Sequence, residues 1–165
     1  MTKEDMTRIR RFEDLGAWRT ARQLTWEVYQ LTGNKGFFRD VALRNLMRRT
    51  AVAVMTDIAE GFESGLTPFF VESLAAARGA AGALRSQLLV AFDQGYIDQE
   101  LFDSLTELSK KAGREATGLL TYIDRRRLAG RNRGRRRGDS ARAATAHRSA
   151  RTNDQRQRTN PESDE

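Results

Sequence analysis

The sequence predicts an all-α protein: an up-down-up-down antiparallel four-helix bundle followed by a disordered basic C-terminal tail. Four segments repeat apolar side chains every three or four residues, which is the spacing of an amphipathic helix. The connections between them, at about 33–37, 61–67 and 95–98, are short, and short connections make neighbouring helices antiparallel. From residue 125 the chain is polar and rich in Arg, a composition typical of disorder.

The first helix is expected at about 15–32, where apolar residues form one broad face. Asp14 can cap its start, and the turn-forming residues Gly33, Asn34 and Gly36 stop it. A second helix is expected at about 38–60, with Gly61 closing it. Its apolar positions are Leu43, Met47, Ala51, Val54 and Ile58.

The third helix begins with Thr67 as a natural N-cap and Pro68 at the first helical position. It ends at Gly95. Its apolar residues step by four and three, like the seam of a packed bundle: Phe70, Leu74, Ala77, Ala81, Leu84, Leu88 and Ala91. Asp98 is expected to cap a fourth helix that runs to about Asp124.

Gly79 and Gly82 interrupt the third helix, and each costs about 1 kcal/mol relative to Ala in a helix interior. Close approach of another helix would offset that cost. A second stripe of small and apolar residues lies beside the main seam: Val71, Ala75, Gly82 and Leu89. Two interpretations stay open, namely contact with another subunit and a wide apolar face inside a monomer.

Three segments follow from these boundaries. Residues 1–11 are expected to form a flexible N-terminus, residues 12–124 the bundle, and residues 125–165 a disordered Arg-rich tail. The chain has no Cys, so neither a disulfide nor a Cys-ligated metal is expected. With no secretory signal and no apolar run of about 18 residues, the sequence predicts a cytoplasmic protein outside the membrane.

Enzyme signatures are missing, so the sequence predicts a non-enzymatic protein with no catalytic residue, no cofactor and no metal. Asp57, Glu60 and Glu63 form an acidic cluster at the end of the second helix, where the helix dipole disfavours negative charge. They should need a cationic partner, supplied by Arg49, Arg78 or a neighbouring subunit. A metal site is the weaker alternative, because residues 1–124 contain no His.

Positive charge is concentrated at the C-terminal end. Residues 1–124 hold 16 Lys and Arg against 17 Asp and Glu, whereas residues 125–165 hold 13 Arg against 5 acidic residues. Such a tail predicts binding of nucleic acid, as RNA or single-stranded DNA, with little sequence preference. The alternative is a solubilising extension without a ligand. The candidate contacts are Arg125, Arg126, Arg127, Arg131, Arg133, Arg135, Arg136 and Arg137.

Four Arg residues of the bundle are secondary candidates for phosphate contact: Arg48, Arg49, Arg78 and Arg85. None has an acidic residue three or four positions away on its own helix, whereas Arg44 can pair with Asp40. The alternative is that these four side chains are solvated or meet acidic groups on neighbouring helices or subunits.

Several short motifs in order resemble a known family. They are Phe12-Glu13-Asp14-Leu15 before Trp18, Arg48-Arg49, Ile58-Ala59-Glu60-Gly61-Phe62, Ala77-Arg78-Gly79 and Gly95-Tyr96-Ile97. Together they resemble the bacterial four-helix bundle proteins encoded in intervening sequences of large-subunit rRNA genes, which are distantly similar to the accessory variability protein of diversity-generating retroelements. The resemblance covers about 12–124.

The resemblance implies a ring-like homopentamer without catalytic activity. For the retroelement relatives it also implies binding of nucleic acid and of a reverse transcriptase through a basic surface. This chain departs from the family pattern on its second and third helices, which argues against a shared polar site there. Leu46, Ala53, Ala80 and Ala83 stand where Gln, Ser, Ser and Glu are usual, and Asp57 replaces an Asn.

Taken together, the sequence predicts a homo-oligomeric nucleic-acid-binding protein, with RNA slightly favoured. The alternative function is a protein-interaction scaffold that docks a polymerase-type partner such as a reverse transcriptase. A carboxylate metal enzyme is the third and weakest interpretation.

Overall fold

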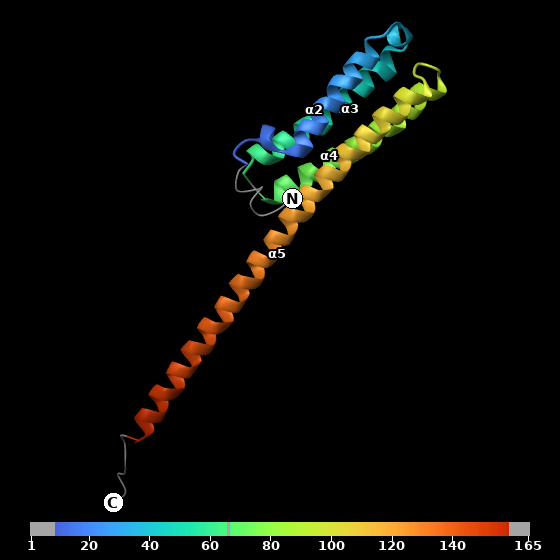
Figure 1. The fold of residues 1–165 in the computed structure, drawn as a ribbon. Coiled ribbons are helices and arrows are strands. Elements are labelled where there is room, and N and C mark those ends of the chain that lie inside the picture. Colours follow the sequence, from blue (N-terminus) through green and yellow to red (C-terminus); the bar gives the residue numbers. More distant parts are fainter. Residues whose placement is uncertain (1–8, 66, 159–165) are drawn as a thin grey trace, which may run out of the picture. The chain divides into compact units, whose positions relative to one another are not determined.

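The structure, a computed structural model, describes residues 9–65 and 67–158, with side chains for residues 9–65 and 67–129. The described part is all-α, as predicted. Its α-helices are α2 (Gly16–Thr32), α3 (Val41–Glu63), α4 (Thr67–Asp93) and α5 (Gln99–Arg158), and its short 3-10 helices are η1 (Phe12–Asp14) and η2 (Lys35–Phe38) (Figure 1). The chain divides into two compact units, residues 1–124 and 125–165.

The first unit is a four-helix bundle made of α2, α3, α4 and the part of α5 up to Asp124. In each successive pair of helices, later residues of one helix meet earlier residues of the next, so the helices run antiparallel. The contacts are Thr25–Ala51 and Thr32–Arg48 for α2 and α3, Thr50–Gln87 and Gly61–Ser73 for α3 and α4, and Ala81–Ser109 and Phe92–Phe102 for α4 and α5.

The core lies between the helices and uses one apolar stripe from each. On α3 all five predicted core positions are buried, and on α4 the seam from Leu74 to Ala91 is buried as well. The second stripe of α4 is different, because Leu89 is 48% exposed and Val71 only half-buried. This chain therefore leaves part of that stripe uncovered, against the interpretation of one wide core-facing surface.

Two carboxylates cap helices by accepting a hydrogen bond from a backbone amide in the first turn. Asp98 accepts from the amide of Leu101 at 2.9 Å, which confirms its predicted role at the start of α5. Asp40 accepts from the amide of Leu43 at 2.9 Å and caps α3. The predicted Asp40–Arg44 ion pair is wrong for the described side chains, because the Asp40 carboxylate serves the helix end instead.

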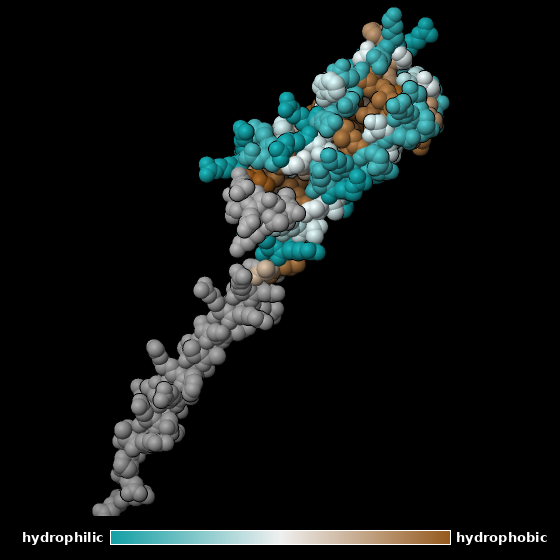
Figure 2. Space-filling model, in the orientation of Figure 1, coloured by the Kyte–Doolittle hydropathy of each residue, from teal (hydrophilic) through white to brown (hydrophobic). Residues whose placement is uncertain are grey.

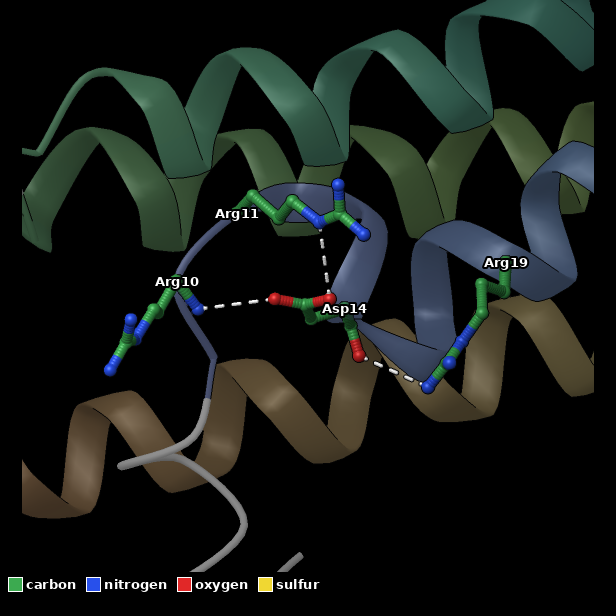
Figure 3. A network of polar contacts seen from close by, with 4 residues as sticks. All are labelled: Arg10, Arg11, Asp14 and Arg19. Carbon is green, nitrogen blue, oxygen red and sulfur yellow. Dashed lines mark hydrogen bonds and ion pairs between the residues drawn. The ribbon is translucent and has the colours of Figure 1, made fainter.

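Asp14 does not cap α2, contrary to the prediction. The N-cap position is Leu15, and Asp14 lies in η1 just before it. The Asp14 carboxylate accepts hydrogen bonds from the Arg10 amide (3.3 Å) and from Arg11 Nε (3.4 Å), while Arg19 donates to the Asp14 carbonyl (Figure 3). The Arg10 amide, more than any other group, holds the pKa of Asp14 below its ordinary value.

Residues 9–11 of the expected flexible N-terminus make contacts with the bundle. Ile9 packs against the bundle core, and Arg10 and Arg11 are tied to Asp14. Apolar burial and two hydrogen bonds thus fix a stretch whose charged composition suggested freedom. Residues 1–8 of that predicted segment lie outside the described residues.

Gly95 ends α4 as predicted. Its φ of +69° is the left-handed conformation that glycine adopts without strain. The Tyr96 amide donates to the Ala91 carbonyl and the Gly95 amide to the Phe92 carbonyl, both at 2.9 Å, the pattern of a Schellman motif. Gly61, in contrast, does not close α3. That helix continues to Glu63, and Gly61 is buried within it.

The predicted disordered tail begins at residue 125, and in the structure α5 continues past Asp124 to Arg158. The prediction rested on the lack of apolar residues, which argues against packing but not against a helix. A helix satisfies its backbone hydrogen bonds internally, and Arg, Ala and Gln are strong helix formers. No Pro occurs between Pro68, in the first turn of α4, and Pro161, which follows the last residue of α5. Residues 159–165 lie outside the described residues.

Polar side chains cover much of the bundle face drawn in Figure 2, with hydrophobic atoms showing between the helices. Among the described residues, no helix is both long enough and apolar enough to cross a lipid bilayer.

Candidate nucleic-acid interface

The structure separates the four predicted Arg residues of the bundle into two grooves. Arg78 and Arg85 line a groove between α4 and α5, whereas Arg48 and Arg49 line another beside α3. The four predicted candidates therefore do not line one common groove.

The α4–α5 groove has a volume of about 430 Å³ and lies within the bundle unit. Small residues line it between two basic rows, one from each helix. Its lining residues are Arg78, Ala81, Gly82 and Arg85 from α4, and Ser109, Lys110, Gly113, Arg114 and Thr117 from α5.

Close packing of α4 on α5 produces this groove. The buried Ser109 hydroxyl donates a 2.7 Å hydrogen bond to the Ala81 carbonyl, and a Cβ added at Gly113 would lie 3.8 Å from the Ala81 Cβ. The helices can approach because Ala and Gly carry little or no side chain. The long basic side chains then stand around a shallow floor.

The two rows of cations differ in their local partners. On α5, Glu107 binds Lys110 Nζ at 2.6 Å and lies 4.0 Å from Arg114 Nη2. The hydrogen bond from Lys110 lowers the pKa of Glu107, which stays ionised at neutral pH. On α4, Arg78 and Arg85 are exposed and form no ion pair or hydrogen bond within the side chains that the structure describes.

The second groove is larger, about 670 Å³, and Arg48 in it is already engaged. Arg48 Nε donates to the Thr32 hydroxyl at 2.7 Å, and its guanidinium lies 4.8 Å from the centre of the Tyr29 ring. Stacking on an aromatic ring is a typical use of Arg. Arg49 is exposed beside it and has no such contact in the described structure. The other residues that line this second groove are Asn45, Val52, Ala53 and Thr56.

The Arg-rich stretch begins inside α5. Arg125, Arg126 and Arg127 are exposed there. The backbone positions of the remaining candidates, Arg131, Arg133, Arg135, Arg136 and Arg137, are helical, and their side chains lie outside the described residues.

The acidic cluster on α3 has no cationic partner within the described chain. Burial, reinforced by the nearby charge of Glu60, raises the pKa of Asp57. Neither Arg49 nor Arg78 forms an ion pair with Asp57, Glu60 or Glu63 there, so this part of the expectation is wrong. No group of three potential metal ligands occurs among the described residues.

Sequence analysis missed Lys110 and Arg114 because Glu107 precedes both within one or two turns and made them look neutralised. A signal was present all the same. Lys110 and Arg114 are four residues apart on one helical face, flanking Gly113, just as Arg78 and Arg85 flank Gly82. The contacts of Ala81 with Ser109 and Gly113 show that the two faces meet.

Comparison with known proteins gives one family and one fold. The family model described as 23S rRNA-intervening sequence protein matches residues 13–118. A crystal structure of a protein of unknown function from the S23 ribosomal protein family of Bacteroides thetaiotaomicron is similar, with a TM-score of 0.58 and 14% identity over 63% of this chain and 97% of that one. At this identity the likeness concerns the fold. No curated protein sequence matches the chain.

Proposed function

The chain belongs to the 23S rRNA-intervening sequence protein family, and from this premise we propose that it is a non-enzymatic, cytoplasmic, homo-oligomeric protein that binds nucleic acid and prefers RNA. Contacts to phosphate supply most of the affinity, so binding has little sequence preference. The Arg-rich stretch of α5 is the principal contact, and the Arg residues of the bundle are secondary.

One observation carries this proposal: residues 125–165 contain 13 Arg against 5 acidic residues, while the bundle is nearly neutral. Eight of these Arg lie between Arg125 and Arg137. Guanidinium groups bind phosphate through paired hydrogen bonds and stack on exposed bases. A helix through this stretch keeps the eight positions at fixed spacing, which lowers the entropy lost on binding.

A salt-dependent titration tests this function directly. If about eight phosphates are neutralised, log K should fall against log salt with a slope of roughly −6 to −7. Replacing the eight Arg by Gln, a helix former of similar propensity, should weaken binding of a fluorescent single-stranded RNA by more than about tenfold and flatten the slope. Equal affinity and equal slope in the two proteins would contradict the proposal.

Assembly into a homo-oligomer, a pentamer by family resemblance, would add valence, because several Arg-rich segments tethered on one particle raise the effective concentration of charge. Uncovered apolar side chains on the bundle support an interface between copies: Leu46, Leu89 and Val90 are all 44–48% exposed. Light scattering of the full chain should give a multiple of 18.7 kDa. A monomeric mass would remove the contribution from valence.

A protein-interaction scaffold is the second candidate function, and the same exposed apolar residues favour it. Leu46 and Val90 lie one turn beyond the Thr50–Gln87 hydrogen bond on α3 and α4. By analogy with retroelement relatives, the partner would be a polymerase-type enzyme such as a reverse transcriptase. A chain that carries both Leu46→Gln and Val90→Gln tests this function. Loss of binding to such an enzyme, with unchanged affinity for RNA, would support the scaffold.

A further inference from the structure

We infer that the α4–α5 groove holds phosphate groups of a bound RNA strand, with Arg78 and Arg85 as its open contacts and Glu107 as an internal competitor for Lys110 and Arg114. This inference rests on the proposed function and assigns it a second, structured site within the bundle unit. The α4–α5 groove is separate from the Arg-rich stretch, so the two contributions can be measured independently.

The first support is the pair of unengaged cations on α4. Arg78 and Arg85 are seven residues apart, which is about two helical turns and about 10 Å along the axis. They therefore stand on one face, at the two ends of the groove. Neither has an acidic partner among the described side chains, and a strand with one negative charge per nucleotide can meet both.

The second support is the floor. Gly82 costs the helix about 1 kcal/mol relative to Ala, yet packing within the described chain does not require it. A Cβ at Gly82 would meet only Arg85 Nη2, at an ordinary 3.7 Å. Glycine is also the residue that allows a ligand to approach the backbone closely. A floor of Ala81, Gly82 and Gly113 between guanidinium groups suits a thin phosphodiester strand better than the surface of a folded acidic protein.

The third support is how weakly Lys110 and Arg114 are held. Glu107 has 61% of its side chain exposed, and its two partners expose 41% and 65%. Exposed ion pairs contribute little to stability, because water screens them. A phosphate can therefore replace Glu107 at small cost, and the groove then presents four cations. Glu107 reduces the affinity of the free groove without closing it.

Paired substitutions in the full chain test the inference. Arg78→Gln with Arg85→Gln removes two charges from the groove. The control is Arg22→Gln with Lys111→Gln, which also removes two positive charges, but from exposed positions that do not line the groove. Titration with a fluorescein-labelled single-stranded RNA at several salt concentrations compares both with the unaltered chain, and circular dichroism checks that all three remain helical.

The groove variant should bind RNA about tenfold more weakly, with a salt slope flatter by about 1.4 for two lost phosphate contacts on a single strand. The control should lose less than about threefold. Glu107→Gln should bind about threefold more tightly, because it frees Lys110 and Arg114.

Three different outcomes would contradict the inference or a part of it. If the unaltered chain binds RNA but the groove variant and the control lose affinity equally, the groove is not a contact site and the proposed function stands. If the unaltered chain binds no RNA at any salt concentration, the proposed function fails and the groove assignment fails with it. A Glu107→Gln protein that binds more weakly would contradict the role of Glu107 as a competitor.

Discussion

Helix α4 packs against two neighbours through glycine, and the two contacts have opposite character. Toward α3, a Cβ built at Gly61 would lie 2.7 Å from the Ser73 Cβ and 2.8 Å from Phe70 Cδ2, so that contact is closed. Toward α5, Gly82 and Gly113 border a groove of about 430 Å³ lined by four cations. The same residue type thus serves packing at one contact and access at the other.

The largest change in the free energy of unfolding should come from adding a methyl group at Gly61, in the closed contact between α3 and α4. Gly61→Ala should lower the free energy of unfolding by about 1–3 kcal/mol, because the new methyl group overlaps a Cβ that cannot move without its backbone. Thermal or denaturant unfolding measures the loss. Gly118→Ala is the matched control, since nothing lies within 4 Å of a Cβ there. Equal free energies of unfolding for the two variants would contradict the closed contact at Gly61.

Removing the hydrogen bond that joins α4 to α5 should have the next largest effect. Ser109 is fully buried, and its hydroxyl donates to the Ala81 carbonyl at 2.7 Å. Ser109→Ala should cost about 1 kcal/mol in denaturant unfolding. The exposed Ser104→Ala on the same helix should change stability by less than about 0.5 kcal/mol. A neutral Ser109→Ala would mean that this bond does not hold the groove together.

Adding a methyl group at Gly82, in the open contact between α4 and α5, should change stability and RNA binding in opposite directions. Gly82→Ala should raise the free energy of unfolding by about 0.5–1 kcal/mol, because Ala is the better helix former and has room. It should also weaken RNA binding, because the methyl group occupies the floor of the groove.

Gly79→Ala serves as the control for this substitution. It should give the same gain in stability with RNA affinity unchanged, since Gly79 does not line the groove and nothing lies within 4 Å of a Cβ there. Loss of stability or of assembly on Gly79→Ala would instead indicate that another copy packs closely against this residue.

The smallest effect concerns Asp57 on α3. Its pKa is raised in the folded state, chiefly by burial, so folding disfavours the ionised carboxylate. Asp57→Asn should therefore stabilise the bundle at neutral pH, by about 0.5 kcal/mol at most for a group that still reaches solvent. The gain should vanish below the ordinary pKa of Asp, where both states are protonated. A gain that persists at low pH would have another cause.

Helix periodicity was enough to predict the bundle, because one apolar stripe per helix determines which face is buried. The seam of α4 and the Asp98 cap illustrate this, since each depends on residues close in sequence. Asp14 was assigned wrongly because its carboxylate accepts a hydrogen bond from the Arg10 amide, four residues away, instead of capping α2. Gly61 was assigned wrongly for the opposite reason, since it contacts Ser73 and Phe70 of the next helix, which local spacing does not reveal.

The candidate site could be predicted only in part for the same reason. Arg78 and Arg85 stood out by their lack of a nearby acidic residue, whereas Lys110 and Arg114 were hidden by Glu107. Joining the two pairs requires knowledge that Ala81 faces Ser109, a contact 28 residues apart in sequence. The extent of α5 to Arg158 was not predicted, because low apolar content opposes packing but does not oppose a helix.

Lysine footprinting is the most direct test of the open side of α4, the α4–α5 groove, as a contact site for RNA. Lys110 lines the groove and Lys111, its neighbour in sequence, is exposed without lining it. Acetylation of the full chain with and without single-stranded RNA, quantified by mass spectrometry, should show several-fold protection of Lys110 and none of Lys111. Equal modification of both lysines in the presence of bound RNA would contradict the assignment of the groove.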